Sequence, residues 1–92
     1  MYHITNNIKV RKTISNGKSC YQVLKNKSVV YQKVIIEGTI HNSEITARKD
    51  SIKTAKYFAL KEEFDFLDYE EKEKIINKLM NNQKEIAKIL KK

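Results

Sequence analysis

One stretch of this chain specifies a β-hairpin: residues 8–25 have the sequence IKVRKTISNGKSCYQVLK. Apolar and polar residues alternate over positions 8–14 with one lapse at Lys12, which is typical of a half-buried strand. The dipeptide Asn16-Gly17 follows, and it favours a two-residue type I′ turn because both central residues of that turn need a positive φ. We therefore predict that Ser19–Lys25 forms the returning strand.

The short turn also fixes how the two strands are paired. If Ile14 lies opposite Ser19, then Val10 lies opposite Val23 and the side chains divide between two faces. The apolar face carries Ile8, Val10, Ile14, Tyr21 and Val23. The polar face carries Lys9, Arg11, Thr13, Cys20, Gln22 and Leu24. Turn chemistry and burial pattern agree on this register, although neither was used to choose the other.

Further strands are expected beside this hairpin. Ser28–Ile36 has apolar residues on both faces, which indicates a central strand. A short fourth strand is predicted within Ile40–Ala47, and Tyr2–Thr5 is a candidate edge strand. The sheet should therefore be antiparallel, with three to five strands.

Two helices are expected after the sheet. Asp50 or Ser51 can cap the first helix by accepting its free N–H groups. This helix has two apolar stripes, one for the sheet and one for the last helix: Ile52, Ala55 and Ala59 in the first, Tyr57, Leu60 and Phe64 in the second. The predicted fold is α+β in a single domain over residues 1–92: a sheet packed on one helix, followed by a longer C-terminal helix.

That last helix is expected to span residues 68–90, starting at a capping box, Asp68-Tyr69-Glu70-Glu71. It would be about 35 Å long, more than a small sheet can cover. Its apolar stripe either docks on the first helix of the same chain or pairs with a second copy as a homodimer. The candidate oligomerisation residues are Ile76, Leu79, Gln83, Ile86 and Leu90.

The positive charge is concentrated in one half of the chain. Residues 1–56 contain eleven Lys and Arg against three acidic residues, a net charge of +8, whereas residues 57–92 carry eight of each and are neutral. Such an asymmetry indicates a polyanionic partner such as nucleic acid, or a protein–nucleic-acid complex. A lysine-rich surface that is merely solvated is the alternative.

The candidate nucleic-acid-binding residues come from the hairpin, its turns and the expected start of the first helix. There the helix dipole and free N–H groups favour an anion. Tyr31 is added as a candidate for base stacking, although a strand tyrosine commonly belongs to the core. The full set is Lys9, Arg11, Lys18, Lys25, Lys27, Tyr31, Arg48, Lys49, Lys53 and Lys56.

Catalytic and metal-binding patterns are not found. His3 and His41 have no partner at ligand spacing, and the single Cys20 offers neither a disulfide nor an activated thiol. Glu70-Glu71-Lys72-Glu73 has the residue types of a metal nuclease, but on a predicted helix. We therefore expect a non-enzymatic protein without cofactor or metal. With no signal peptide and no membrane-spanning stretch, we expect it to be soluble and cytoplasmic, in a bacterial host.

Residues 50–59, DSIKTAKYFA, resemble two nucleic-acid-binding helices. One is the Ser-x-Lys-x-Ala-Lys helix of double-stranded-RNA-binding domains. The other is the helix that follows the sheet in the arm-type DNA-binding domains of phage integrases. The resemblance implies contacts to the nucleic-acid backbone from Lys53 and Lys56. The first helix of the RNA-binding family, which precedes its sheet, has no counterpart in this sequence.

Glu44-Ile45-Thr46-Ala47, continuing into Ser51-Ile52 and Ala55-Lys56, is similar to a family of small phage anti-CRISPR proteins. That resemblance implies an inhibitor that occupies the nucleic-acid-binding surface of a CRISPR effector complex, and this is the leading functional prediction. The alternative is a DNA- or RNA-binding accessory or regulatory protein of a mobile element. An oligomerising scaffold built on residues 68–90 is a third class and needs no nucleic acid.

Overall fold

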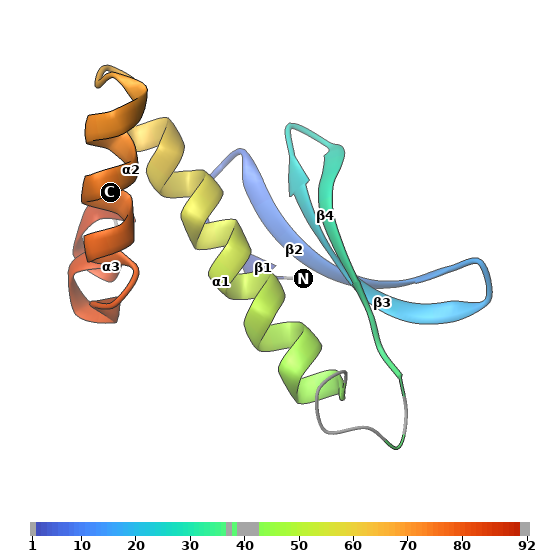
Figure 1. Ribbon diagram of the computed structural model, residues 1–92. Helices are drawn as coiled ribbons and strands as arrows, with labels where there is room; N and C mark the ends of the chain where they lie inside the picture. Colours follow the sequence, from blue (N-terminus) through green and yellow to red (C-terminus); the bar gives the residue numbers. More distant parts are fainter. Residues whose placement is uncertain (1, 37, 39–42, 91–92) are drawn as a thin grey trace. The chain divides into compact units, whose positions relative to one another are not determined.

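The computed structural model describes residues 2–36, 38 and 43–90. Their α+β architecture is a four-stranded antiparallel sheet with three helices, which confirms the predicted class (Figure 1). The chain divides into two compact units, a sheet unit of Met1–Ala55 and a helical unit of Lys56–Lys92. The elements are β1 (Tyr2–His3), β2 (Ile8–Ser15), β3 (Lys18–Lys25), β4 (Ser28–Val34), α1 (Glu44–Glu63), α2 (Tyr69–Leu79) and α3 (Gln83–Leu90).

The hairpin has the predicted register. Ile14 pairs with Ser19 and Val10 with Val23, and the turn residues Asn16 and Gly17 have φ of 53° and 77°. Ile8, Val10 and Val23 are fully buried. Ile14, at the far end of the same face, is an exception to the predicted burial because it is 72% exposed. The alternation of side chains therefore separates two faces of the sheet as the sequence predicts.

The strand order is β1-β2-β3-β4, so the prediction that Ser28–Ile36 forms the central strand is wrong. Within the described residues β4 is an edge strand, and Val29 and Val30 are 46% and 39% exposed. The register between β3 and β4 shifts, pairing Val23 with Tyr31 but Leu24 with Val29. The extra residue, Val30, changes the phase of the alternation, which is why apolar residues fall on both faces of this strand.

Helix α1 begins at Glu44, earlier than predicted. The expected strand over Ile40–Ala47 is therefore wrong for residues 44–47, and its first part lies outside the described residues. The expected cap at Asp50 or Ser51 is also wrong. Both residues lie inside the helix, while the Oγ of Ser43 accepts from the Thr46 N–H at 3.4 Å.

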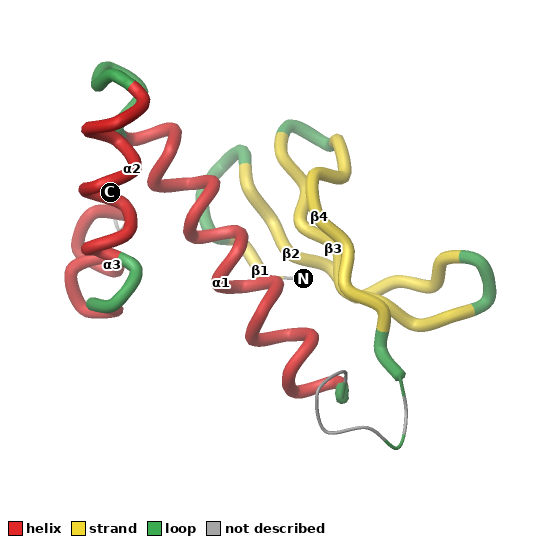
Figure 2. The backbone as a smooth tube through the Cα atoms, viewed as in Figure 1, coloured by secondary structure: helices red, strands yellow, loops and turns green. Residues whose placement is uncertain are grey.

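The first half of α1 runs beside the sheet (Figure 2), and its contacts place it on the apolar face. Its contact side consists of small residues four apart, Ala47, Ser51 and Ala55, all fully buried. Glu44 and Asp50 of α1 contact side chains of the same sheet face, Lys12 and Lys33. We call the opposite face of the sheet, the one that carries Lys9 and Arg11, the outer face.

The helical unit has its own core, formed by Leu60, Ile76 and Ile86 with Tyr57, Phe64, Leu79, Met80, Ile89 and Leu90 around it. The second predicted stripe of α1 thus packs on the C-terminal helices. Asp68 caps α2 as predicted, accepting from the Glu71 N–H at 2.9 Å.

The prediction of a single long C-terminal helix is wrong, because α2 ends at Leu79 and α3 starts at Gln83. Asn82 begins the new helix, accepting from the Glu85 N–H at 3.3 Å. The sequence left two alternatives for the apolar stripe, and the structure shows the one in which it packs within the same chain. Ile76 and Ile86 are fully buried in the core of the helical unit. Gln83 instead accepts a hydrogen bond from Lys56 Nζ at 3.0 Å. The homodimer stays an untested prediction.

We predict that Ser51→Ala increases the free energy of unfolding by roughly 0.5–1 kcal/mol, because alanine favours the helix interior and removes a buried hydroxyl. The Ser51 Oγ has no hydrogen-bond partner among the described residues. Urea unfolding measures the change. Asp68→Ala is the matched control and should cost about 1 kcal/mol as the loss of a real cap. A comparable loss for Ser51→Ala would contradict the packing of α1.

Candidate nucleic-acid interface

A row of polar side chains crosses the outer face of the sheet. Arg11 Nε on β2 donates to Gln22 Oε1 on β3 at 2.9 Å, and Gln22 Nε2 donates to Gln32 Oε1 on β4 at 2.8 Å. Gln22 is only 7% exposed, so its amide orientation is fixed by these two bonds. The row holds the Arg11 guanidinium through Nε, and its two Nη groups are not used in that bond.

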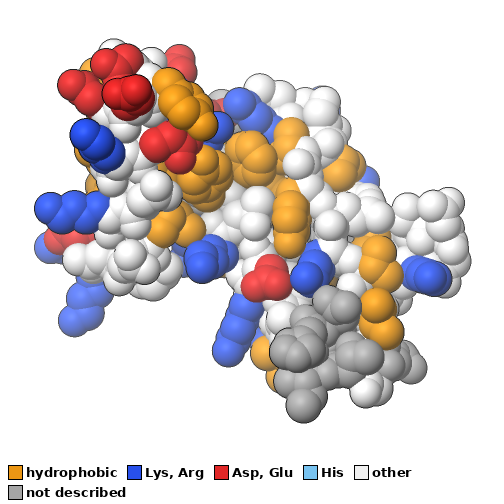
Figure 3. Space-filling view, in the orientation of Figure 1, with side chains coloured by type: hydrophobic (Ala, Val, Ile, Leu, Met, Phe, Trp, Pro, Cys, Tyr) orange, Lys and Arg blue, Asp and Glu red, His pale blue; other side chains and the backbone are white. Residues whose placement is uncertain are grey.

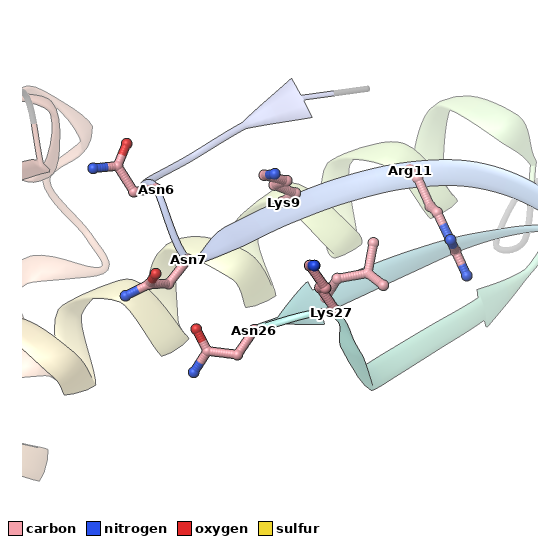
Figure 4. A pocket seen from close by; sticks show the side chains of 7 residues that line it. Asn6, Asn7, Lys9, Arg11, Asn26 and Lys27 are labelled. Carbon is pink, nitrogen blue, oxygen red and sulfur yellow. The ribbon is translucent and has the colours of Figure 1, made fainter.

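Next to this row lies a pocket of about 330 Å³ (Figure 4). It is formed by the loop before β2, by β2 itself, by β3 and by the β3–β4 turn. The residues that line it are Asn6, Asn7, Lys9, Arg11, Leu24, Asn26 and Lys27. The described lining thus has three cationic side chains, three amides and one aliphatic side chain, and no carboxylate.

Local backbone chemistry holds the two loops of the pocket together. The Thr5 Oγ1 accepts from the N–H groups of Asn7 and Ile8 at 3.2 and 3.1 Å, which fixes the loop before β2. The Asn26 N–H donates to the Asn7 carbonyl at 2.9 Å and ties that loop to the β3–β4 turn. Asn26 and Lys27 have φ of 51° and 72°, as a tight two-residue turn requires. These hydrogen bonds hold the backbone of the two loops in place on either side of the pocket.

The described acidic residues of the sheet unit lie on the side of α1. Glu44 bonds Lys12 and accepts from the Tyr21 hydroxyl at 3.4 Å, and Asp50 lies 3.6 Å from Lys33. The hydrogen bond from Lys12 holds the pKa of Glu44 below its ordinary value. These two carboxylates therefore neutralise lysines on the helix side of the sheet. They do not neutralise the cations of the outer face, which keep their positive electrostatic potential.

The structure does not bring all ten predicted residues onto one surface. Lys9, Arg11 and Lys27 converge on the pocket, and Lys18 lies at the exposed end of the outer face. Tyr31 is in register with Val23 and Val10, so it lies on the helix side, as does Lys25, which pairs with Ile8.

The four remaining cations, Arg48, Lys49, Lys53 and Lys56, lie along α1. Because α1 starts at Glu44, they occupy its second to fourth turns and not its N-terminus. The expectation that they lie at the start of a helix is therefore wrong, and their contact with nucleic acid stays an untested prediction. Lys53 and Lys56, which the resemblance to RNA-binding helices singled out, are also mid-helix, and Lys56 bonds Gln83 in the helical unit.

Sequence reasoning missed the amide residues of the site. Asn6 and Asn7 lie in a loop, and residue periodicity predicts helices and strands but not loop structure. Gln22 and Gln32 lie within predicted strands, where nothing in the sequence marked them as part of a site. One signal was available: the pairing of Ile8 with Lys25 follows from the Asn16-Gly17 turn and brings Asn7 next to Asn26.

The helical unit has a different surface. Between residues 62 and 71 it has six acidic residues and no cation. On the face shown in Figure 3, acidic side chains gather where α1 passes into α2. Among residues 2–36, 38 and 43–90 no cluster of potential metal ligands occurs, and no helix there has the length and apolarity to cross a membrane.

Comparisons with models of protein families, with curated proteins and with solved structures found no match. The resemblances to anti-CRISPR proteins and to nucleic-acid-binding helices therefore stay predictions of the sequence. The predicted inhibitor role in particular can be tested only with its partner, a CRISPR effector complex.

We predict that Glu44→Gln makes the protein slightly less stable at pH 7 and that this difference disappears at low pH. A carboxylate with a lowered folded pKa stabilises the fold above its ordinary value of 4.5 and loses this effect as the pH falls through the folded pKa. The effect should be small because the pair is exposed and screened. Urea midpoints of both proteins between pH 7 and pH 3 measure it; a constant difference over that range would contradict the assignment.

Proposed function

We propose that this chain is a non-catalytic binding protein that engages the phosphate backbone of nucleic acid through the outer face of its sheet. The observation that carries the proposal is the convergence of Lys9, Arg11 and Lys27 on a pocket lined by no carboxylate among the described residues.

The physical argument concerns where the charge lies and how it is held. Three cations around one concavity raise the local potential more than the same charges spread over a surface. Arg11 is held by Gln22, so less conformational entropy is lost when its Nη groups bind phosphate. Arginine also presents parallel N–H groups that match two phosphate oxygens.

The same chemistry favours binding over catalysis. Cationic and amide side chains can hold an anion, but the described residues of the lining include no carboxylate, histidine or thiol that would act as base or nucleophile. Occupancy of the pocket is the function that this set of groups supports.

The triple variant Lys9→Gln, Arg11→Gln, Lys27→Gln tests the proposal. If each side chain neutralises one phosphate of a duplex, its loss lowers the slope of log affinity against log salt by about 0.9, so the triple variant should lose roughly 2–3 units of slope. Fluorescence anisotropy of a labelled 12-base-pair duplex between about 50 and 200 mM salt measures this.

The matched control is Arg48→Gln, Lys49→Gln, Lys53→Gln, which removes the same net charge from α1. This variant should keep most of the wild-type slope. Equal losses in the two variants would show that binding follows net charge alone. The proposal would fail if the wild-type protein did not retain nucleic acid in a salt-sensitive way. Thermal melting of each variant shows whether it is folded.

A further inference from the structure

The geometry points to a single-stranded nucleic acid as the ligand, with one nucleotide seated in the pocket: its phosphate on Lys9, Arg11 and Lys27 and its base edge on the asparagines. This inference rests on the proposed function and goes further, because phosphate binding alone would not distinguish a single strand from a duplex.

The shape of the site is the first argument. The site is a partly open hollow of about 330 Å³. Pockets from about 300 Å³ upward are of the size that holds small molecules. In a duplex the bases are stacked and paired inside, so a duplex presents only its sugar–phosphate ridge to a small pocket. A single strand can turn a base outward and place it in a cavity.

The chemistry of the lining is the second argument. Lysine and arginine suffice for phosphate, whereas the amides of Asn6, Asn7 and Asn26 add neutral donors and acceptors. Paired donors and acceptors are what the edge of a base requires, and an asparagine amide matches adenine in two hydrogen bonds. Leu24, 8% exposed, supplies an apolar contact for the ring. The pocket thus offers separate groups for phosphate, base edge and base plane.

Preorganisation is the third argument. The asparagines lie on loops that are fixed by backbone bonds, since the Asn26 N–H donates to the Asn7 carbonyl and Thr5 Oγ1 accepts from the Asn7 N–H. Figure 4 shows the three amides at one end of the pocket and Arg11 at the other, with Lys9 and Lys27 between them. A phosphate and its own base can therefore be held at different points of one cavity.

The test compares a labelled 12-nucleotide single strand with the duplex of the same sequence at one salt concentration, by fluorescence anisotropy. We expect the single strand to bind at least fivefold more tightly. In the double variant Asn7→Ala, Asn26→Gly, its affinity should fall about tenfold, as for one or two lost hydrogen bonds. Duplex binding should change less than twofold.

Asn16→Gly is the matched control. Asn16 also has a positive φ in a two-residue turn, but it lies at the other end of the hairpin and does not line the pocket. It should bind both ligands as the wild type does. Because glycine tolerates positive φ, the Asn26→Gly change keeps the turn while removing the amide.

A second measurement needs no variant. Adenosine monophosphate should displace the labelled strand at lower concentration than ribose 5-phosphate, which has the same phosphate and no base. Equal competition, or equal affinity for strand and duplex, would overturn the single-strand inference and leave the proposed function standing. Failure of every nucleic acid to bind in a salt-sensitive way would overturn the proposed function itself.

Discussion

The pairing register of β2 and β3 is the constraint from which the rest of the sheet unit follows. The Asn16-Gly17 turn sets that register. Both residues have a positive φ, which most residues with a Cβ atom avoid, so the two-residue turn forms at this position and not at a neighbouring one. With period-two alternation, Ile8 and Val10 then enter the core while Lys9 and Arg11 face away from it. A slip of one residue would exchange these sets, burying two charges and exposing two aliphatic side chains, which is strongly unfavourable. The position of the cationic pocket is therefore a consequence of the turn.

Charge is distributed in the same two-sided way. The acidic residues of α1, Glu44 and Asp50, contact lysines on the helix side of the sheet. On the outer face the polar groups bond to one another, as Arg11 and Gln22 do, and no carboxylate is found among the part of the pocket lining that the structure describes. The net charge of the chain is one ground for the proposed polyanionic partner, and the pairing pattern determines which cations could contact such a partner.

Local chemistry predicted much of the fold and only part of the candidate site. The hairpin register, the Asp68 cap and the α1 stripe of Tyr57, Leu60 and Phe64 follow from turn, cap and periodicity rules within short windows. The edge position of β4 was missed because a bulge at Val30 changes the alternation of side chains in that strand. The break between α2 and α3 was missed because Asn82 was not recognised as a helix cap. The pocket was missed because it joins the loop residues 6–7 to the turn residues 26–27. The predicted hairpin register places these residues side by side, but the register was not followed beyond the two paired strands.

Backbone amide chemical shifts during titration with a 12-nucleotide strand test the central claim directly, since a chain of 10.8 kDa is well suited to NMR. The account predicts progressive shifts for Lys9, Arg11, Asn26 and Lys27, and unchanged resonances for Arg48, Lys49 and Lys53 at the same ligand concentrations. Shifts confined to α1, with the resonances of the pocket unmoved, would contradict it.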